Sequence, residues 1–246
     1  MPFKVSEVKT DFEFTELIAC EWESYENPHQ TFFRLFCPIR GTGPNARQES
    51  LEECTQRQLE WHRSDPSSYW QKVTDTATGE IVAGALWKLY SENPFEKEDH
   101  EEAYWYPEGG QREYVNGALE IFGRPRATMG RRPHVYLNII FTRSDYRRQG
   151  AGDLIMNWGI TKAQEMGVEM WLDATPYGVP LYKKYGFVTV IENPLNPKKD
   201  DPDDEWKQLD QELGPLSMTV MWRPASGLYE EGKTVFPWNG STGLSR

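Results

Sequence analysis

The residues best suited to chemistry form one short run, Tyr146 to Gly152 (YRRQGAG), between an apolar stretch and an amphipathic one. Gly150 and Gly152 allow backbone angles denied to other residues, so consecutive amide N–H groups can converge on one anion. A helix that begins here adds the positive end of its dipole. The run therefore predicts a phosphate-binding loop, although a two-glycine turn can also be a plain connector.

Two common nucleotide-binding patterns are missing from this loop. It lacks the GxGxxG spacing of a dinucleotide-binding turn. It also lacks the lysine and hydroxyl residue of a Walker A loop, because Asp153 follows Gly152. Arg147 and Arg148 either reinforce phosphate binding with their charge or are solvated surface residues.

The elements on either side of the loop must position it. Val135 to Phe141 is a nearly unbroken apolar run, which is typical of a central strand covered on both faces. Gly150 to Gly167 has the spacing of an amphipathic helix, and Val168 to Leu172 predicts a further strand. Together they predict a βαβ unit with parallel strands.

The rest of the chain predicts an α/β fold. The expected elements, in chain order, are a strand from Phe3, helices after Asp11 and Asn45, a hairpin of Tyr69–Thr74 and Ile81–Leu89, a short helix from Pro176 to Gly186, and strands Phe187–Ile191 and Ser217–Trp222. Ser91 to Pro133 is expected to hold helices and loops. The acidic stretch from Asn193 to Glu212 is expected to be a solvated loop.

Composition limits the possible partners and compartments. The 246 residues contain 27 Lys plus Arg and 38 Asp plus Glu, a net charge of −11, which disfavours nucleic-acid binding. No apolar run is long enough for a membrane span, and no targeting segment is evident, so we expect a cytoplasmic protein. Cys20, Cys37 and Cys54 lack the spacing of a metal site or a disulfide framework, and we expect no metal.

The loop also resembles a known motif. Arg147-x-x-Gly150-x-Gly152 after a strand is similar to the Q/R-x-x-G-x-G/A motif of the GCN5-related N-acetyltransferases (GNAT), whose loop holds the pyrophosphate of acetyl-coenzyme A. The resemblance continues in order and spacing through the segments DYRRQGAG, Trp158-Gly159, MWLDAT, LYKK and Gly186-Phe187. It particularly resembles a group of fungal members of the family.

This resemblance implies a mixed sheet of six to seven strands, splayed between the fourth and fifth strands to leave a slot for the pantetheine arm. It implies a single domain over residues 1–223, with an insertion at about 91–133, an acidic loop at about 193–213 and a C-terminal tail at 224–246. The implied cofactor-binding residues are Ile139, Ile140, Phe141, Arg147, Arg148, Gln149, Gly150, Ala151, Gly152, Asp153, Thr175 and Tyr182. Amide N–H groups near Ile140 and Phe141 would polarise the thioester carbonyl.

Catalytic roles follow from the same resemblance. Tyr182 matches a tyrosine that often protonates the departing thiolate in this family, with a core aromatic as the alternative. Asn138 lies where some relatives keep a carboxylate, but an amide can at most position a water. Asp173 is one candidate for the base. Glu120, His134 and the pair Glu101 and Glu102 are the others, and an amine that arrives deprotonated needs none.

The function expected from the sequence is acetyl-coenzyme A dependent N-acetylation of a primary amine of a small molecule, by direct transfer. Acids and aromatics in the 91–133 insertion favour a cationic acceptor with an apolar or ring portion. Two alternatives stay open at this stage: a protein lysine or N-terminal acetyltransferase, and a non-catalytic protein that binds acyl-coenzyme A. We expect no nucleic-acid or membrane partner, and a monomer or homodimer.

Overall fold

A computed structural model of the chain describes residues 2–96 and 102–238. Seven strands form one sheet. They are β1 (Phe3–Glu7), β2 (Ser68–Asp75), β3 (Ile81–Tyr90), β4 (His134–Thr142), β5 (Glu169–Ala174), β6 (Val188–Leu195) and β7 (Leu216–Arg223). The α-helices are α1 (Asp11–Glu26), α2 (Ala46–Ser64), α3 (Gly110–Met129), α4 (Ala151–Met166), α5 (Val179–Lys184) and α6 (Asp204–Leu213), with 3₁₀ turns η1 (Thr31–Leu35) and η2 (Ser144–Tyr146).

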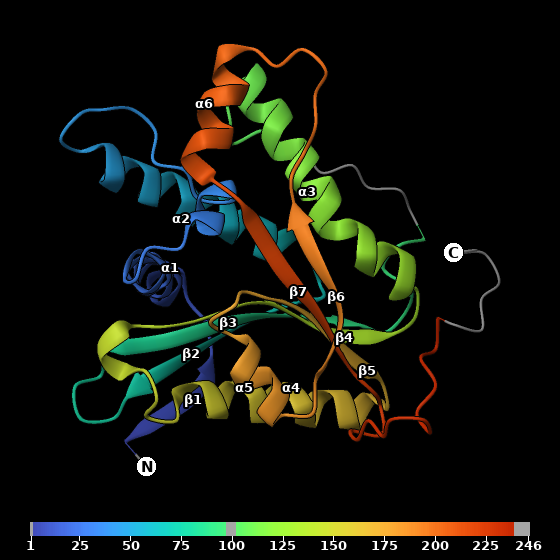
Figure 1. Ribbon diagram of the computed structural model, residues 1–246. Helices are drawn as coiled ribbons and strands as arrows, with labels where there is room; N and C mark the ends of the chain where they lie inside the picture. Colours follow the sequence, from blue (N-terminus) through green and yellow to red (C-terminus); the bar gives the residue numbers. More distant parts are fainter. Residues whose placement is uncertain (1, 97–101, 239–246) are drawn as a thin grey trace.

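The strand order across the sheet is β1-β2-β3-β4-β5-β7-β6. Strands β4 and β5 are parallel, and every other neighbouring pair is antiparallel. The expected α/β class, with its mixed seven-stranded sheet, is therefore confirmed. The predicted hairpin corresponds to β2 and β3, and the last two predicted strands are β6 and β7 (Figure 1).

The β4–α4–β5 unit is built as the sequence predicts. Glycines in the left-handed region flank α4, with φ of +97° at Gly150 and +67° at Gly167. In the middle of the helix, a Cβ at Gly159 would lie 2.2 Å from the Trp87 ring. Only glycine therefore allows α4 to lie this close to β3, and the helix buries Ile155 and Met156 against the sheet.

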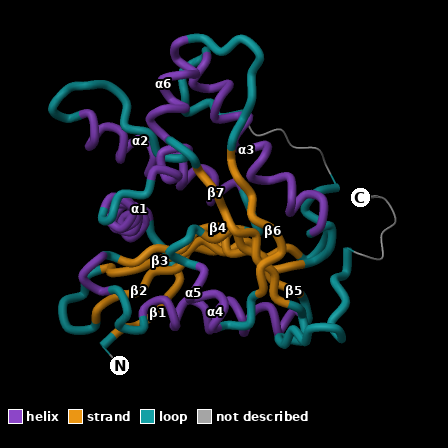
Figure 2. Tube along the Cα trace, in the orientation of Figure 1, coloured by secondary structure: helices purple, strands orange, loops and turns teal. Residues whose placement is uncertain are grey.

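The helices cover both faces of the sheet (Figures 1 and 2). Helices α4 and α5 lie on one face, where Trp87, Ile155 and Leu172 are part of the buried cluster. Helix α1 lies on the other face and packs Leu17 and Trp22 into a cluster with residues of β2 and β4. Helix α3 packs on β6 and β7 and on α6. This arrangement leaves the end of β4 between α1 and α4.

The expected solvated loop at 193–213 is wrong. Strand β6 continues to Leu195, and α6 begins after Asp203, whose side chain accepts a hydrogen bond from the Trp206 amide. Trp206, Leu209 and Leu213 are buried, and the Trp206 ring lies 5.2 Å from that of Tyr114 on α3. Their spacing of three and four is that of a helix face, which the many acids of the segment concealed.

The expected mixture of helices and loops in 91–133 corresponds to α3 and its flanking segments, with residues 97–101 outside the described part of the chain.

After β7, the rings of Phe236 and Trp238 pack on Trp222. The ring centroids of Trp238 and Trp171 lie 5.1 Å apart. No helix in the described ranges combines the length and apolar character needed to cross a bilayer.

Candidate functional site

Strands β4 and β5 separate halfway along β4. Their pairing runs from His134 with Glu169 to Leu137 with Leu172. Beyond that point β5 pairs with β7, and β4 pairs with β3 as far as Thr142. The sheet is therefore splayed between its fourth and fifth strands, as expected, and the second half of β4 has an open side.

Asn138 is the extra residue of a β-bulge at the start of the splay. Leu86 pairs with Ile139 and Trp87 pairs with Leu137, so Asn138 has no opposite residue on β3. Bulges redirect side chains, and they are frequent next to active sites. The side chain of Asn138 is exposed, and it lines the cavity that opens at the splay.

A cavity of about 500 Å³ extends from the 147–153 loop through the splay to the space between α1 and α2. Its volume is in the usual range for small-molecule sites. The loop end is lined by Arg147, Arg148, Gly150, Ala151, Gly152 and Asp153, the middle by Asn138, Ile139, Ile140, Phe141, Thr175 and Tyr182, and the inner end by Glu21, Phe36, Cys37, Arg57, Gln58, Trp61 and Phe122. Of the predicted cofactor-binding residues, Gln149 does not line it.

The loop has the backbone geometry of an anion cradle. Arg148 has φ of +59° and Gly150 has φ of +97°, and Gly150 is the N-cap of α4. The first amides of α4 therefore point toward the loop without intrahelical partners. A Cβ at Gly152 would make only an ordinary contact of 3.4 Å with Leu181, so packing alone does not require glycine there. The loop fits a pyrophosphate held by peptide N–H groups.

The Arg147 side chain is not directed at that cradle. Its Nε donates to the Thr142 carbonyl oxygen at 3.0 Å, and its Nη2 donates to the Ser24 carbonyl oxygen at 2.7 Å. The guanidinium therefore ties the end of β4 to α1. Arg148 is exposed, and the Gln149 amide donates to the Asp145 carbonyl oxygen.

The Asp153 carboxylate also faces away from the cradle. Its Oδ1 accepts hydrogen bonds from Lys184 Nζ at 2.7 Å and Tyr185 Oη at 2.6 Å. These donors lower the pKa of Asp153, so the side chain is ionised and would repel a phosphate. Only the backbone N–H of Asp153 is available to the loop.

Tyr25 of α1 meets the splayed half of β4. Its hydroxyl donates to the Ile140 carbonyl oxygen at 2.8 Å. Since the N–H and C=O of one strand residue point to the same side, the Ile140 N–H also faces the open side of β4. The sequence predicted that amides near Ile140 and Phe141 face the thioester carbonyl, and Ile140 N–H is one of these.

Tyr182 lies across the cavity on α5. Its ring packs on Gly178, where a Cβ would come within 2.6 Å of Cε2. Burial raises the pKa of Tyr182 well above its usual value, which keeps the phenol protonated. Thr175 lines the cavity beside it, and its carbonyl oxygen, not its side chain, accepts the amides of Gly178 and Val179 at the start of α5.

Asp173 lines the cavity, although its side chain is almost completely buried. Its Oδ2 accepts the Tyr136 hydroxyl at 2.9 Å, and Arg126 Nε lies 3.9 Å away. Its Oδ1 has no hydrogen-bond partner in the described part of the chain. Burial raises the pKa of Asp173, although Arg126 acts in the opposite direction.

The structure does not bring the other base candidates to the cavity. Glu120 is exposed on α3 and pairs with Arg124, and Glu102 pairs with Arg112. His134 is buried with its Nδ1 2.7 Å from the Arg132 carbonyl oxygen, and burial lowers its pKa to about 4. Glu101 lies outside the described residues. Within the described ranges, no cluster of His, Cys, Asp and Glu suits a metal ion.

Sequence reasoning missed Glu21, a carboxylate that lines the inner end of the cavity. Glu21 is 1% exposed, and its Oε2 accepts the Gln58 amide at 2.9 Å. Burial raises its pKa well above the usual value. The signal was present in the sequence: Leu17, Ile18, Glu21 and Tyr25 share one face of α1, so a single acid interrupts an apolar stripe.

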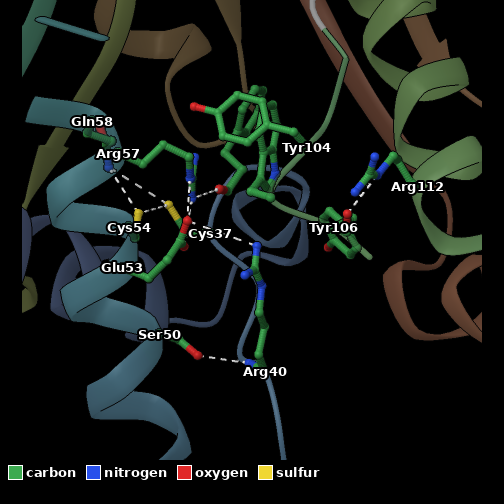
Figure 3. A network of polar contacts seen from close by, with 12 residues as sticks. Cys37, Arg40, Ser50, Glu53, Cys54, Arg57, Gln58, Tyr104, Tyr106 and Arg112 are labelled. Atoms are coloured by element: carbon green, nitrogen blue, oxygen red, sulfur yellow. Dashed lines mark hydrogen bonds and ion pairs between the residues drawn. The ribbon is translucent and has the colours of Figure 1, made fainter. Parts of the chain in front are cut away.

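A polar network borders the inner end of the cavity (Figure 3). Arg57 of α2 donates to Glu53. Its guanidinium packs against the rings of both Trp61 and Trp105, at 4.8 and 4.9 Å from their centroids. The thiols of Cys37 and Cys54 lie beside it, 2.8 Å apart. The hydrogen bond with the Cys37 thiol lowers the pKa of Cys54 to about 7.

Comparison with known proteins identifies the domain. Residues 82–198 match the acetyltransferase (GNAT) domain family. Among solved structures, the chain is similar to "histone acetyltransferase HPA2 and related acetyltransferase" from Corynebacterium glutamicum (22% identity, TM-score 0.55, covering 91% of this chain and 97% of that one). It is also similar to mosquito arylalkylamine N-acetyltransferase like 5b (14% identity, TM-score 0.58, 90% and 99%). These two likenesses concern the fold alone. No curated protein matches the chain.

Proposed function

Since residues 82–198 form a GNAT acetyltransferase domain, we propose that the protein transfers the acetyl group of acetyl-coenzyme A directly to the primary amine of a small molecule. One observation carries this proposal. A single cavity of about 500 Å³ joins the 147–153 loop to a buried carboxylate, Glu21, through the splay of the sheet. Donor and acceptor would therefore meet in one cavity.

The donor would be held mainly by backbone groups. The amides at Gly150, Ala151 and Gly152 would bind its pyrophosphate, and the open side of β4 would pair with its pantetheine arm. Arg147 would act indirectly, because its guanidinium fixes the loop to α1. When bound, acetyl-coenzyme A supplies a reactive thioester.

The polar side chains around the splay would manage charge and protons. The Ile140 N–H would donate to the thioester oxygen as negative charge develops there. Tyr182, which is protonated, would donate a proton to the departing sulfur. Asn138 would orient the acceptor or a water. Asp173 would support the cavity wall rather than take a proton, because the Tyr136 hydroxyl and the nearby Arg126 both stabilise its ionised form.

A small acceptor is supported by the enclosure of the inner end. Glu21 and Arg57 are almost completely buried between α1 and α2, where a free amine fits more readily than a residue of a folded protein. Direct transfer is supported by the cysteines. Cys20 and Cys54 do not line the cavity, and burial raises the pKa of the Cys37 thiol, which does line it, well above the usual value.

Two measurements test the proposal. Calorimetry with acetyl-coenzyme A should show binding at one site, and a thiol-release assay should show turnover with members of a panel of amines, amino acids and aminosugars. Binding without turnover on this panel or on lysine peptides would favour a non-catalytic acyl-coenzyme A protein. Turnover on peptides alone would favour a protein acetyltransferase, and a preference for anionic or hydroxyl acceptors would refute the assignment.

A further inference from the structure

The inner end of the cavity contains two buried ionisable groups, the acid Glu21 and the base Arg57, that the donor does not need. We propose that they select the acceptor, an inference that depends on the proposed function. The acceptor is a primary ammonium compound with an aromatic or apolar body and a neutral oxygen at its far end. Glu21 binds the ammonium, and Arg57 Nη1 binds the oxygen.

Glu21 is well placed for the ammonium. Its Oε2 accepts the Gln58 amide, whereas its Oε1 has no hydrogen bond within residues 2–96 and 102–238. Tyr25 lies one helical turn further along α1, so the two side chains are neighbours. Because the Tyr25 hydroxyl contacts Ile140 in the splay, Glu21 lies about one turn of helix from the reacting end of the cavity.

Arg57 has one donor group left for a ligand. Its Nε donates to Glu53 at 2.9 Å, and its Nη2 donates to the Phe36 carbonyl oxygen at 2.9 Å. Its Nη1 is buried and has no partner in the described part of the chain. An unsatisfied buried donor is costly, particularly on a charged group, unless a ligand or water satisfies it. The side chain is 3% exposed, and its guanidinium packs against the rings of Trp61 and Trp105.

The charge balance favours a neutral oxygen over a carboxylate. Glu53 already neutralises Arg57, so a hydroxyl, ether or carbonyl oxygen is sufficient to satisfy Nη1. An acceptor with a carboxylate next to its amine, such as an α-amino acid, would bring a second anion to Glu21.

The surfaces near these two groups suit a flat apolar body. Phe32, Phe36, Trp61 and Phe122 line the cavity at this end. Aromatic walls stabilise a ring by burial and by edge-to-face contact. Because the volume of about 500 Å³ must also accommodate the pantetheine arm, the acceptor can be little larger than one ring with a short amine arm.

Glu21 also gives the acceptor a route for its proton. One N–H proton of the ammonium moves to Glu21 Oε1, which leaves a neutral amine with a free electron pair and a neutral carboxylic acid. The amine nitrogen can then form its bond to the acyl carbon as the carbon–sulfur bond breaks. Tyr182 donates its proton to the departing thiolate, and the second proton lost by the nitrogen restores the Tyr182 phenol. Glu21 returns its proton to solvent when the amide leaves.

The test compares two acceptors that differ by one oxygen, phenethylamine and its para-hydroxy analogue tyramine. For the unaltered protein, kcat/KM should be about tenfold higher for tyramine, as expected for one hydrogen bond to a charged group. Arg57→Lys should lower kcat/KM for tyramine alone, to about the level of phenethylamine. Glu21→Gln should lower both by about a hundredfold and leave their ratio unchanged.

Matched controls make the same substitutions on the solvent faces of the same helices. Glu16→Gln on α1 and Arg63→Lys on α2 should leave both values within about twofold. Melting temperatures report whether each variant folds, and the tyramine preference of the unaltered protein needs no variant at all.

The outcomes separate this inference from the proposed function. Amine turnover with equal kcat/KM for the two probes, or unchanged turnover in Glu21→Gln, overturns the inference and leaves the proposed function standing. Acetyl-coenzyme A binding without thiol release on any amine overturns both.

Discussion

The Tyr25 hydroxyl donates a hydrogen bond of 2.8 Å to the Ile140 carbonyl oxygen, although the two residues are 115 positions apart. This contact joins α1 to β4 at the point where β4 has lost its neighbour β5. A side chain thus satisfies a backbone group that a strand would otherwise pair with. The splay is therefore a built feature of the sheet, held open from the α1 side.

Replacing Tyr25 with phenylalanine should remove this contact and keep the ring stacked on Phe33. We expect the free energy of unfolding to fall by about 1 kcal/mol, and the Kd of acetyl-coenzyme A to rise several-fold, because the Ile140 peptide is less well held. Urea denaturation and calorimetry measure the two effects. The control Tyr229→Phe, in the C-terminal segment, should change neither the free energy of unfolding nor the Kd. An unaltered Kd in Tyr25→Phe would show that the hydrogen bond from Tyr25 to Ile140 is not needed to bind acetyl-coenzyme A.

Replacing Tyr182 with phenylalanine tests the proton donor. The ring should still pack on Gly178 and Phe187, so the affinity for acetyl-coenzyme A should stay within about twofold. The rate of thiol release should fall by about 10- to 100-fold. Tyr185→Phe is the matched control on the same segment, since its hydroxyl bonds Asp153 and does not line the cavity. A rate in Tyr182→Phe equal to that of the unaltered protein at every pH would exclude the role.

Gly150 and Gly167 allow a paired test of the cradle. Both have positive φ at the ends of α4, and neither would have a neighbour within 4 Å of an added Cβ. Alanine at either position should cost about 1 kcal/mol of stability through backbone strain. Only Gly150→Ala should also weaken acetyl-coenzyme A binding, by about tenfold or more in calorimetry. Equal affinities in the two variants would mean that the loop backbone does not hold the donor.

The parts of the fold that were predictable are those with a local signal. The β4–α4–β5 unit has an apolar strand, flanking glycines and a helical period within one short stretch, and the structure follows it closely. Helix α6 has the same kind of signal in Trp206, Leu209 and Leu213. There, the surrounding acids and prolines gave a stronger compositional signal for a loop, and the partner helix α3 lies far away in the sequence.

Trp206→Ala tests the corrected assignment of this segment. Trp206 packs on Tyr114, so its removal should lower the free energy of unfolding by about 3–5 kcal/mol. Lys207→Ala, the exposed neighbour, should stay within about 0.5 kcal/mol. Chemical denaturation of both variants measures the difference. A solvated loop would make the two variants equally stable.

The buried Glu21 predicts a pH-dependent difference in stability. Burial raises its pKa above 4.5 in the folded protein, so the folded state binds more protons than the unfolded state does between the two pKa values. This contribution to stability is complete below the unfolded pKa and is lost as pH rises through the folded pKa. Glu21→Gln removes it. The melting temperature of the variant should equal that of the unaltered protein near about pH 4 and exceed it increasingly toward about pH 8.

Thermal scans across this range check the sign. A variant that is less stable than the unaltered protein at neutral pH would show that the ionised carboxylate is well compensated in the folded state. Glu16→Gln should show no such trend, because Glu16 is exposed.

The part of the site that is built from backbone groups was predictable from the sequence. The roles of individual side chains in the site were less predictable. Gly150, Gly152 and the strand before them indicated the cradle. The Arg147 guanidinium donates to the carbonyl oxygens of Thr142 and Ser24. Because Ser24 lies 123 residues away in the sequence, no local pattern could show that Arg147 binds within the protein and not to a phosphate. Glu21 was missed because an acid on an apolar helix face acquires meaning only when the facing elements are known.

Strand β5 has β4 and β7 as its neighbours, and β7 comes from the last part of the chain, Leu216–Arg223. A chain still on the ribosome can thus complete the phosphate loop long before β5 has its second partner. Until then the edge of β5 is open to pairing with other chains. The side of the cavity that contains Asp173 and Thr175 is therefore completed only when β7 pairs with β5. Nascent chains that end before β7 are expected to be inactive and to depend on chaperones.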